Sequence, residues 1–186
     1  MQKPTFSLRD VILLAILSLI FGALYWGFGF VYNFATIILT PIGWGPAAND
    51  LTIGLWCMAG PLAAILLQRA GAAFIGEFMS AFVEMIFGGQ WGAANLISGL
   101  IQGLGSEAGF AITAYKAFDW RGLLLNCVTL TIATFAWDWF KNGYNQFNPT
   151  TVLGMLIIRF LSILIFDGFL IHAIQKMLTN SQVLSN

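Results

Sequence analysis

The chain has 186 residues, of which 59% are hydrophobic and only 9% are charged. Soluble domains are roughly one-quarter charged, so this composition and a mean hydropathy of +0.82 indicate an integral membrane protein. The formal net charge is zero and the charges stand singly along the chain, which excludes the basic patch that nucleic-acid binding requires.

The N-terminal segment carries Lys3 and Arg9 ahead of a long apolar run, as a signal peptide does. The run continues through "ALYWGFGF" without an A-x-A cleavage site, and further hydrophobic segments follow it. We therefore expect this segment to be retained as the first membrane span.

Six segments are apolar over the length that a membrane helix needs. A hydrocarbon core of ~30 Å requires about 20 helical residues. We predict an all-α membrane protein with a single transmembrane domain over residues 1–186. The expected spans are residues 10–30, 47–68, 71–88, 91–115, 122–140 and 151–177.

Prolines and glycines mark the connections. The stretch "VYNFATIILTPIGWGP" has too short an apolar part to cross the membrane, so we expect an ordered loop or re-entrant segment there, positioned as a lid. Pro61 predicts a kink in the second span, and Pro149 predicts the start of the sixth.

The distribution of Lys and Arg predicts the orientation, because positively charged flanks stay cytoplasmic. With the N-terminus inside, Lys141 is the only positive charge in an outer loop. Both termini are then cytoplasmic in a multi-pass protein of a prokaryotic plasma membrane. The expected cytoplasmic set is Lys3, Arg9, Arg69, Lys116, Arg121 and Lys176.

Acidic side chains lie inside the expected spans, as "GEFMSAFVEM" with Glu77 and Glu84 illustrates. A charged side chain at the membrane centre costs roughly 2.5–3.5 kcal/mol, so each one suggests a function. In the outer half, Glu84 and Asp138 share one deep cation, Arg159, and Lys141 lies near the surface. One acid is then left over, and a cationic ligand would be its partner.

The inner half holds three further acids with no cation at equal depth. Glu77, Glu107 and Asp167 are either structural groups that hydrogen-bond to serines and backbone or members of a proton relay. The sequence leaves both interpretations open.

Aromatic and amide side chains gather toward the predicted outer face. Tryptophan and tyrosine at a membrane surface commonly form an interfacial belt. A belt does not need amides beside it, whereas apolar walls with a few converging polar groups describe a small-molecule site. Asn95 and Gln102, seven residues apart, share one helix face. The gathered residues are Trp44, Trp91, Trp137, Trp139, Tyr144, Asn49, Gln90, Asn95, Asn142 and Asn145.

Small residues are spaced for close helix contact. Gly99 and Gly103 form one G-x-x-x-G pair, and Gly105 and Gly109 form another. In the first span, Ala15, Ser18 and Gly22 form a small-residue face that would meet either neighbouring helices or a separate membrane subunit.

Six spans in under two hundred residues, together with "GEFMSAFVEMIFGGQWGAANLISGLIQGLGSEAGF", resemble the YkoE-type substrate-binding S-components of energy-coupling factor (ECF) vitamin transporters. The likeness runs from "LRDVILLAILSLIFG" through the sixth span. It implies an S-component-like helical bundle that captures thiamine or its hydroxymethylpyrimidine precursor from outside. It also implies a transmembrane coupling subunit and two ATPases as partners.

The resemblance gives the gathered residues specific roles. A carboxylate, Glu84 or Asp138, would balance the thiazolium charge, and Trp91 or Trp139 would stack on a ring. Asn95 or Gln102 would read the pyrimidine edge. Trp44, Asn49 and Tyr144 complete the expected site. S-components dock through A-x-x-x-A in the first helix, where this chain has Ala15, Ser18 and Gly22 instead.

Catalytic and metal-binding motifs are absent from the sequence. There is no G-x-x-x-x-G-K-[ST] for ATP, no G-x-S-x-G nucleophile, and a single histidine, His172. Cys57 and Cys127 stand in apolar runs, as buried thiols do. We expect no cofactor, no metal and no enzyme activity. The rival hypotheses are a proton-coupled secondary transporter of a cationic molecule and a membrane scaffold without a ligand.

Overall fold

The computed structural model describes residues 6–180, and these residues form helices without any strand. The elements, in chain order, are α1 (Leu8–Leu39), η1 (Thr40–Ile42), α2 (Ala47–Thr52), η2 (Ile53–Trp56), α3 (Ala59–Leu67), α4 (Ala72–Ile86), α5 (Ala94–Ile112), α6 (Trp120–Lys141), η3 (Tyr144–Gln146), α7 (Pro149–Ile163), the π-helical η4 (Leu164–Leu170) and α8 (Ile171–Asn180).

Four helical segments are long and apolar enough to cross a membrane: Leu8–Ile42, Ala47–Leu67, Trp120–Lys141 and Pro149–Asn180. The helix α4 is shorter, at 15 residues. The helix α5 has 19 residues, but polar side chains such as Asn95, Gln102 and Glu107 lower its hydropathy. The first predicted span is too short, because α1 continues through much of the expected lid segment to Leu39.

Polar side chains fix where the helices begin. Ser7 and Asp10 form a reciprocal capping box at the start of α1, and Arg69 pairs with Asp10 at 3.0 Å. Asp119 accepts from the backbone of Arg121 at the start of α6. Asn148 and Pro149 begin α7 as the sequence predicts.

The second span is interrupted in its middle. Between η2 and α3, Cys57 and Met58 leave the helical ladder. Pro61 therefore lies in the first turn of α3, where its missing N–H removes no intrahelical hydrogen bond. The structure therefore has a full break in the helix where the sequence predicts a kink. At this break the backbone N–H groups of Ala59 and Gly60 donate to side chains inside the bundle.

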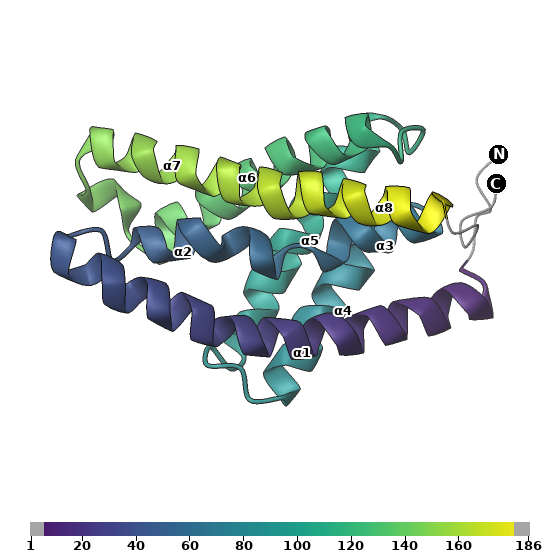
Figure 1. Ribbon diagram of the computed structural model, residues 1–186, viewed down its shortest axis with the longest axis horizontal. Coiled ribbons are helices and arrows are strands. Elements are labelled where there is room, and N and C mark those ends of the chain that lie inside the picture. Colours follow the sequence, from purple (N-terminus) through teal and green to yellow (C-terminus); the bar gives the residue numbers. More distant parts are fainter. Residues whose placement is uncertain (1–5, 181–186) are drawn as a thin grey trace.

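The helices α4 and α5 are inclined to the long segments and pack closely against them (Figure 1). Glycines allow this approach: a Cβ at Gly99 would meet the Cβ of Ala81 at 2.5 Å, and one at Gly109 would overlap the backbone of Asn126. The α5 glycine pairs are thus internal packing positions between α4, α5 and α6.

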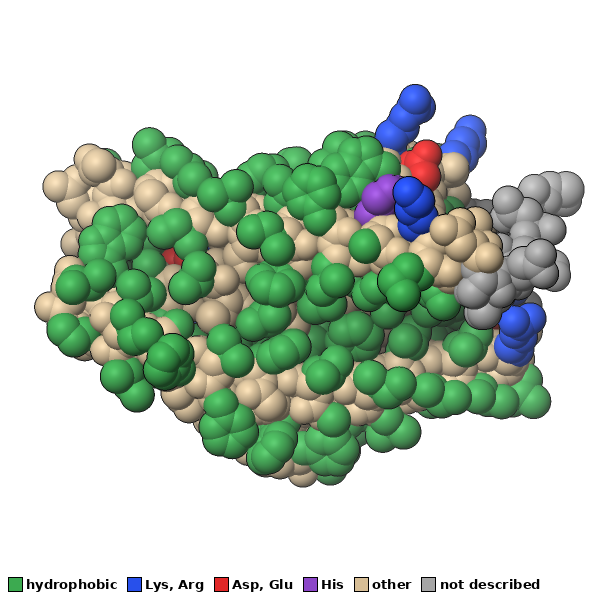
Figure 2. All heavy atoms as spheres, viewed as in Figure 1, with side chains coloured by type: hydrophobic (Ala, Val, Ile, Leu, Met, Phe, Trp, Pro, Cys, Tyr) green, Lys and Arg blue, Asp and Glu red, His purple; other side chains and the backbone are tan. Residues whose placement is uncertain are grey.

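The start of α1 and the end of α8 lie at the same end of the bundle (Figure 1). Figure 2 shows a largely hydrophobic face along the molecule, with Lys and Arg side chains gathered near that end. Among the candidate cytoplasmic charges, Lys3 lies outside the described residues. Large apolar side chains such as Leu8, Phe30 and Ile37 stay exposed along α1, as lipid contact would require.

Candidate ligand-binding site

A cavity of about 60 Å³ lies between the second helical segment, α5 and α6. Its walls combine three indoles with amides, a carboxylate and an ammonium group. The lining residues are Asn49, Ile53, Trp56, Trp91, Asn95, Ser98, Ile101, Gln102, Thr134, Trp137, Asp138 and Lys141.

The cavity brings together five of the nine predicted ligand residues: Asn49, Trp91, Asn95, Gln102 and Asp138. They come from three predicted spans. Four of them lie near the predicted outer ends of these spans, and Gln102 lies further toward mid-membrane on the helix face of Asn95. The structure places them around one space.

Three predicted ligand residues lie elsewhere. Trp139 is 37% exposed and borders an apolar groove with Phe135 and Leu156. It follows Asp138 directly on α6 and points about 100° further around the helix, away from the side on which Trp137 and Asp138 line the cavity. Trp44 packs near Gly154 on α7, and the Tyr144 side chain is fully buried.

Arg159 organises a buried ion network beside the cavity. Its Nε donates to Asp50 Oδ1 at 2.7 Å and its Nη2 donates to Asp138 Oδ2 at 2.6 Å. The Tyr144 hydroxyl donates to Asp50 Oδ2 at 3.2 Å, and Asn49 Nδ2 donates to Asp138 Oδ2 at 2.7 Å. Tyr144 therefore stabilises the network through Asp50 without lining the cavity.

This network changes the predicted charge pairing. Asp138 is not the leftover acid, because Arg159 and Asn49 both bind it. The sequence interpretation missed Asp50, which is fully buried and shares Arg159 with Asp138. Its position next to Asn49 at the start of the second span was the available signal. Two carboxylates therefore face one guanidinium.

Glu84 is the outer acid without a cation in contact among the described residues. It is 1% exposed, and it accepts from Asn95 Nδ2 at 2.5 Å and from Trp56 Nε1 at 3.3 Å. Asn95 and Trp56 both line the cavity, so Glu84 lies directly behind that wall. It orients two cavity residues and adds negative potential there.

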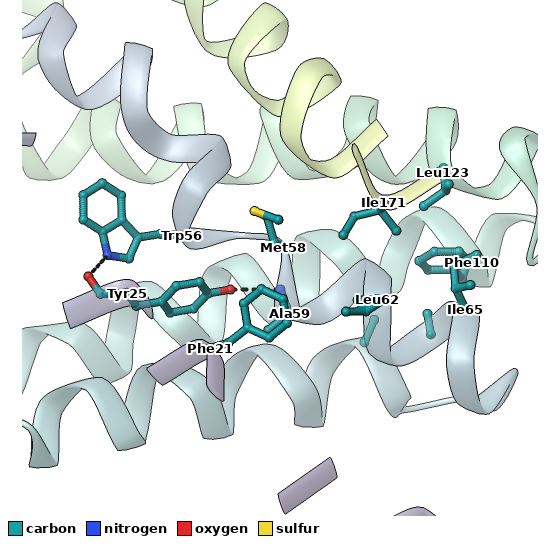
Figure 3. Close-up of a cluster of buried hydrophobic side chains, with 12 residues drawn as sticks. Phe21, Tyr25, Trp56, Met58, Ala59, Leu62, Ile65, Phe110, Leu123 and Ile171 are labelled. Carbon is teal, nitrogen blue, oxygen red and sulfur yellow. Dashed lines mark hydrogen bonds between the residues drawn. The ribbon is translucent and has the colours of Figure 1, made fainter. Parts of the chain in front are cut away.

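Aromatic rings form one side of the cavity. Trp91 packs against Trp56 with centroids 5.4 Å apart and against Tyr32 at 5.3 Å, both edge-on. The Trp56 Nε1 also donates to the backbone oxygen of Tyr25, a bond drawn in Figure 3. A further indole, Trp137, lines the cavity, and its buried Nε1 has no hydrogen-bond partner among the described residues.

The predicted docking face on α1 points inward. Ser18 is 2% exposed, and a Cβ at Gly22 would meet Val83 Cγ1 at 2.5 Å. Only Ala15 of the three is exposed. Gly22 therefore allows close packing of α4 on α1, as the internal-packing alternative expects, and docking of a partner subunit through this face stays a prediction.

The inner acids separate into two environments. Glu107 accepts from the backbone of Gly71 at 2.5 Å and of Phe74 at 3.1 Å, so it ties α5 to the first turn of α4. Glu77 and Asp167 are fully buried and retain oxygens without a partner among the described residues.

Comparisons with known proteins agree with this architecture. Residues 9–133 match the family model described as "ABC-type cobalt transport system, permease component". The chain is 29% identical over 181 residues to YkoE of Bacillus subtilis (strain 168), which is named as an HMP/thiamine permease protein; the match covers 97% of this chain and 88% of YkoE. A crystal structure of an S-component of an ECF transporter superposes with a TM-score of 0.86 at 30% identity, covering 97% of this chain and 89% of that one.

Proposed function

Since the chain belongs to the family of ABC-type cobalt transport system permease components and is an S-component of an ECF transporter, we propose that it captures an aminopyrimidine vitamin, thiamine or its hydroxymethylpyrimidine precursor, from outside the cell. The observation that carries this proposal is the cavity between the second segment, α5 and α6, where indoles, amides and one carboxylate converge. Such walls suit a flat heteroaromatic ring with polar edges.

The charge around the cavity favours a cation or an electron-poor ring. Asp50, Glu84 and Asp138 lie in or behind its walls, against Arg159 and Lys141. Three acids and two bases leave a negative balance when all are ionised. The carboxylate of Asp138 lines the cavity, and Glu84 acts through Asn95 and Trp56.

Cobalt, the substrate in the family description, suits this site less well. Residues 6–180 contain no group of three or more His, Cys, Asp or Glu side chains that could hold a metal ion. The one carboxylate lining the cavity is already bound by Arg159 and Asn49. The amide and indole groups favour an organic ligand.

The cavity volume bears on the choice between the two vitamins. At about 60 Å³ it is smaller than the ~300–1,000 Å³ typical of pockets for drug-sized ligands. A two-ring cation needs the aromatic wall to move further than a single pyrimidine ring does. Trp91 is the residue best placed to move, because it lies in the α4–α5 connection between Gly88 and Gly92, both with positive φ.

The proposal includes the complete membrane arrangement. It comprises a single domain over residues 1–186, six spans that include α4 and α5, and both termini in the cytoplasm. A transmembrane coupling subunit and two ATPases would supply the energy, since the sequence has no phosphate-binding loop. The chain itself would then be a binding subunit and not an enzyme.

Calorimetric titration of the purified chain tests the ligand. We expect saturable binding of thiamine or hydroxymethylpyrimidine, and the difference between the two affinities measures what the thiazolium ring contributes. A ligand that binds only the folded state also raises the apparent melting temperature. Failure of both vitamins to bind or to stabilise the chain would reject the proposal.

Uptake into liposomes separates an S-component that depends on ATPases from a self-sufficient carrier. We expect the chain alone to bind vitamin without accumulating it under a proton gradient. Proton-driven accumulation by the purified chain would contradict the proposed division of labour.

A further inference from the structure

Two carboxyl groups in the inner half of the bundle have no role in the proposed vitamin site. Glu77 on α4 and Asp167 on η4 are both 0% exposed. Neither oxygen of Asp167 has a hydrogen-bond partner among the described residues, and Glu77 Oε1 has none either. A buried ionised carboxylate without donors is strongly unfavourable, so such a group is neutralised by binding a cation.

The backbone near these two acids departs from regular α-helix at two places: the break between η2 and α3, and the π-helical η4. Glu77 Oε2 accepts from Gly60 N at 2.8 Å and from the Tyr25 hydroxyl at 3.1 Å, beside the break before α3. The Tyr25 hydroxyl in turn accepts from Ala59 N at 2.9 Å, as Figure 3 shows. Asp167 lies on the π-helical turn η4, which packs against η2. Interrupted helices and π-turns recur where membrane proteins bind ions or protons.

The charged and titratable neighbours include no cation that could neutralise the pair. Asp167 interacts electrostatically with Glu77, and the surrounding groups are Tyr25, Cys57, Cys127 and, further away, Glu84. The ion pairs among the described residues involve the carboxylates of Asp10, Asp50 and Asp138 instead. Arg159, the buried guanidinium of the outer half, is held by two of those acids.

We propose that Glu77 and Asp167 form a proton-binding site, in which the two carboxyl groups together retain at least one proton at neutral pH. A proton fits better than a metal cation because the described residues offer no cluster of three ligating His, Cys, Asp or Glu side chains. The site is separate from the vitamin cavity, although Tyr25 contacts both Glu77 and Trp56.

Infrared spectroscopy of the purified full chain in detergent tests the site directly. Spectra are recorded at about pH 8, where an ordinary carboxyl group is fully ionised. We expect the carbonyl-stretch band of protonated carboxyl groups to lose intensity in Asp167→Asn and in Glu77→Gln relative to the unmodified chain. Glu107→Gln is the matched control, because Glu107 accepts two backbone N–H bonds and should contribute no protonated band.

Two outcomes would overturn the site. One is identical spectra for the unmodified chain, Asp167→Asn and Glu77→Gln. The other is a fall in the protonated band on adding sodium at fixed pH, since a metal ion would then be the occupant. A melting curve of Asp167→Asn guards against misfolding: a neutral amide replaces a neutral acid, so its midpoint should not fall. None of these measurements requires the vitamin. The proton-binding site can therefore be rejected while the proposed transport function stands, and the transport function can be rejected while the proton-binding site stands.

Discussion

The predicted outer and inner halves of this bundle bury acidic side chains in different ways. In the outer half, Asp50 and Asp138 are paired with Arg159 and hydrogen-bonded to Tyr144 and Asn49. In the inner half, Asp167 has no partner among the described residues and Glu77 is only half satisfied. A protein cation stabilises the carboxylates of Asp50 and Asp138 in the first region, whereas the proposed proton neutralises the acids of the second. The difference indicates that the outer half keeps a defined electrostatic field at a cavity.

Replacing Arg159 with Met should have the largest effect of any change considered. It leaves Asp50 and Asp138 buried without their shared cation, and breaking a buried ion pair from one side costs about 3–5 kcal/mol. Chemical denaturation of the purified chain measures the loss. Asp167→Asn should leave the free energy of unfolding unchanged. Equal destabilisation by the two variants would show that the two halves do not differ in how they stabilise buried acids.

Tyr25→Phe should destabilise the chain by about 1–3 kcal/mol, because the lost hydroxyl leaves Ala59 N without a partner and Glu77 Oε2 with Gly60 N as its one donor. The phenyl ring keeps the packing against Phe21. Tyr32→Phe is a suitable control, since the Tyr32 ring packs on Trp91 and Trp56. A neutral result for Tyr25→Phe would show that the break before α3 does not depend on this hydroxyl.

Glu84→Gln should weaken vitamin binding about tenfold, because it weakens charged hydrogen bonds of ~1.5–3 kcal/mol that orient Asn95 and Trp56 at the cavity. The variant removes negative charge behind Asn95 and Trp56. Glu107→Gln should leave binding unchanged and affect only the start of α4. Calorimetric titrations of both variants check this, and superimposable curves would refute the placement of the site.

Trp91→Phe should weaken binding a few-fold, because an aromatic pair contributes about 0.5–1.5 kcal/mol beyond its buried area. The matched control is Trp139→Phe, which alters an indole on the groove away from the cavity. Titration of both variants with hydroxymethylpyrimidine compares them. A larger loss for Trp139→Phe would move the site to the groove.

Some of the site could be predicted from the sequence. The gathering of indoles and amides at the predicted outer ends of spans identified Trp91 and Asn95, and the seven-residue spacing from Asn95 added Gln102; all three line one cavity. The same reasoning placed Trp139 there as well, because composition cannot tell which side of α6 faces the interior. The side of α6 that faces the interior depends on which helices pack against it. Trp139 lies on the side of α6 that forms a groove with Leu156 of α7.

The pairing of charges was less predictable. Membrane depth alone predicted that Glu84 and Asp138 compete for Arg159. In the structure Arg159 Nε donates to Asp50 instead, and Asn95 Nδ2 donates to Glu84. The small-residue face of α1 was ambiguous for a related reason. Ser18 and Gly22 were as suitable for a partner subunit as for α4, and only the contact with Val83 distinguishes the two.

By itself, the sequence determined that this is a helical membrane protein of the S-component family, because hydropathy, length and motif content are properties of the chain read in order. The tertiary structure decided which polar groups meet: which acid shares Arg159, which indoles enclose the cavity, and which carboxyl groups are left without donors. The physical reason is range. Partition into a membrane adds up residue by residue along a segment, whereas a hydrogen bond or ion pair requires two side chains from distant segments to lie within about 3 Å of each other.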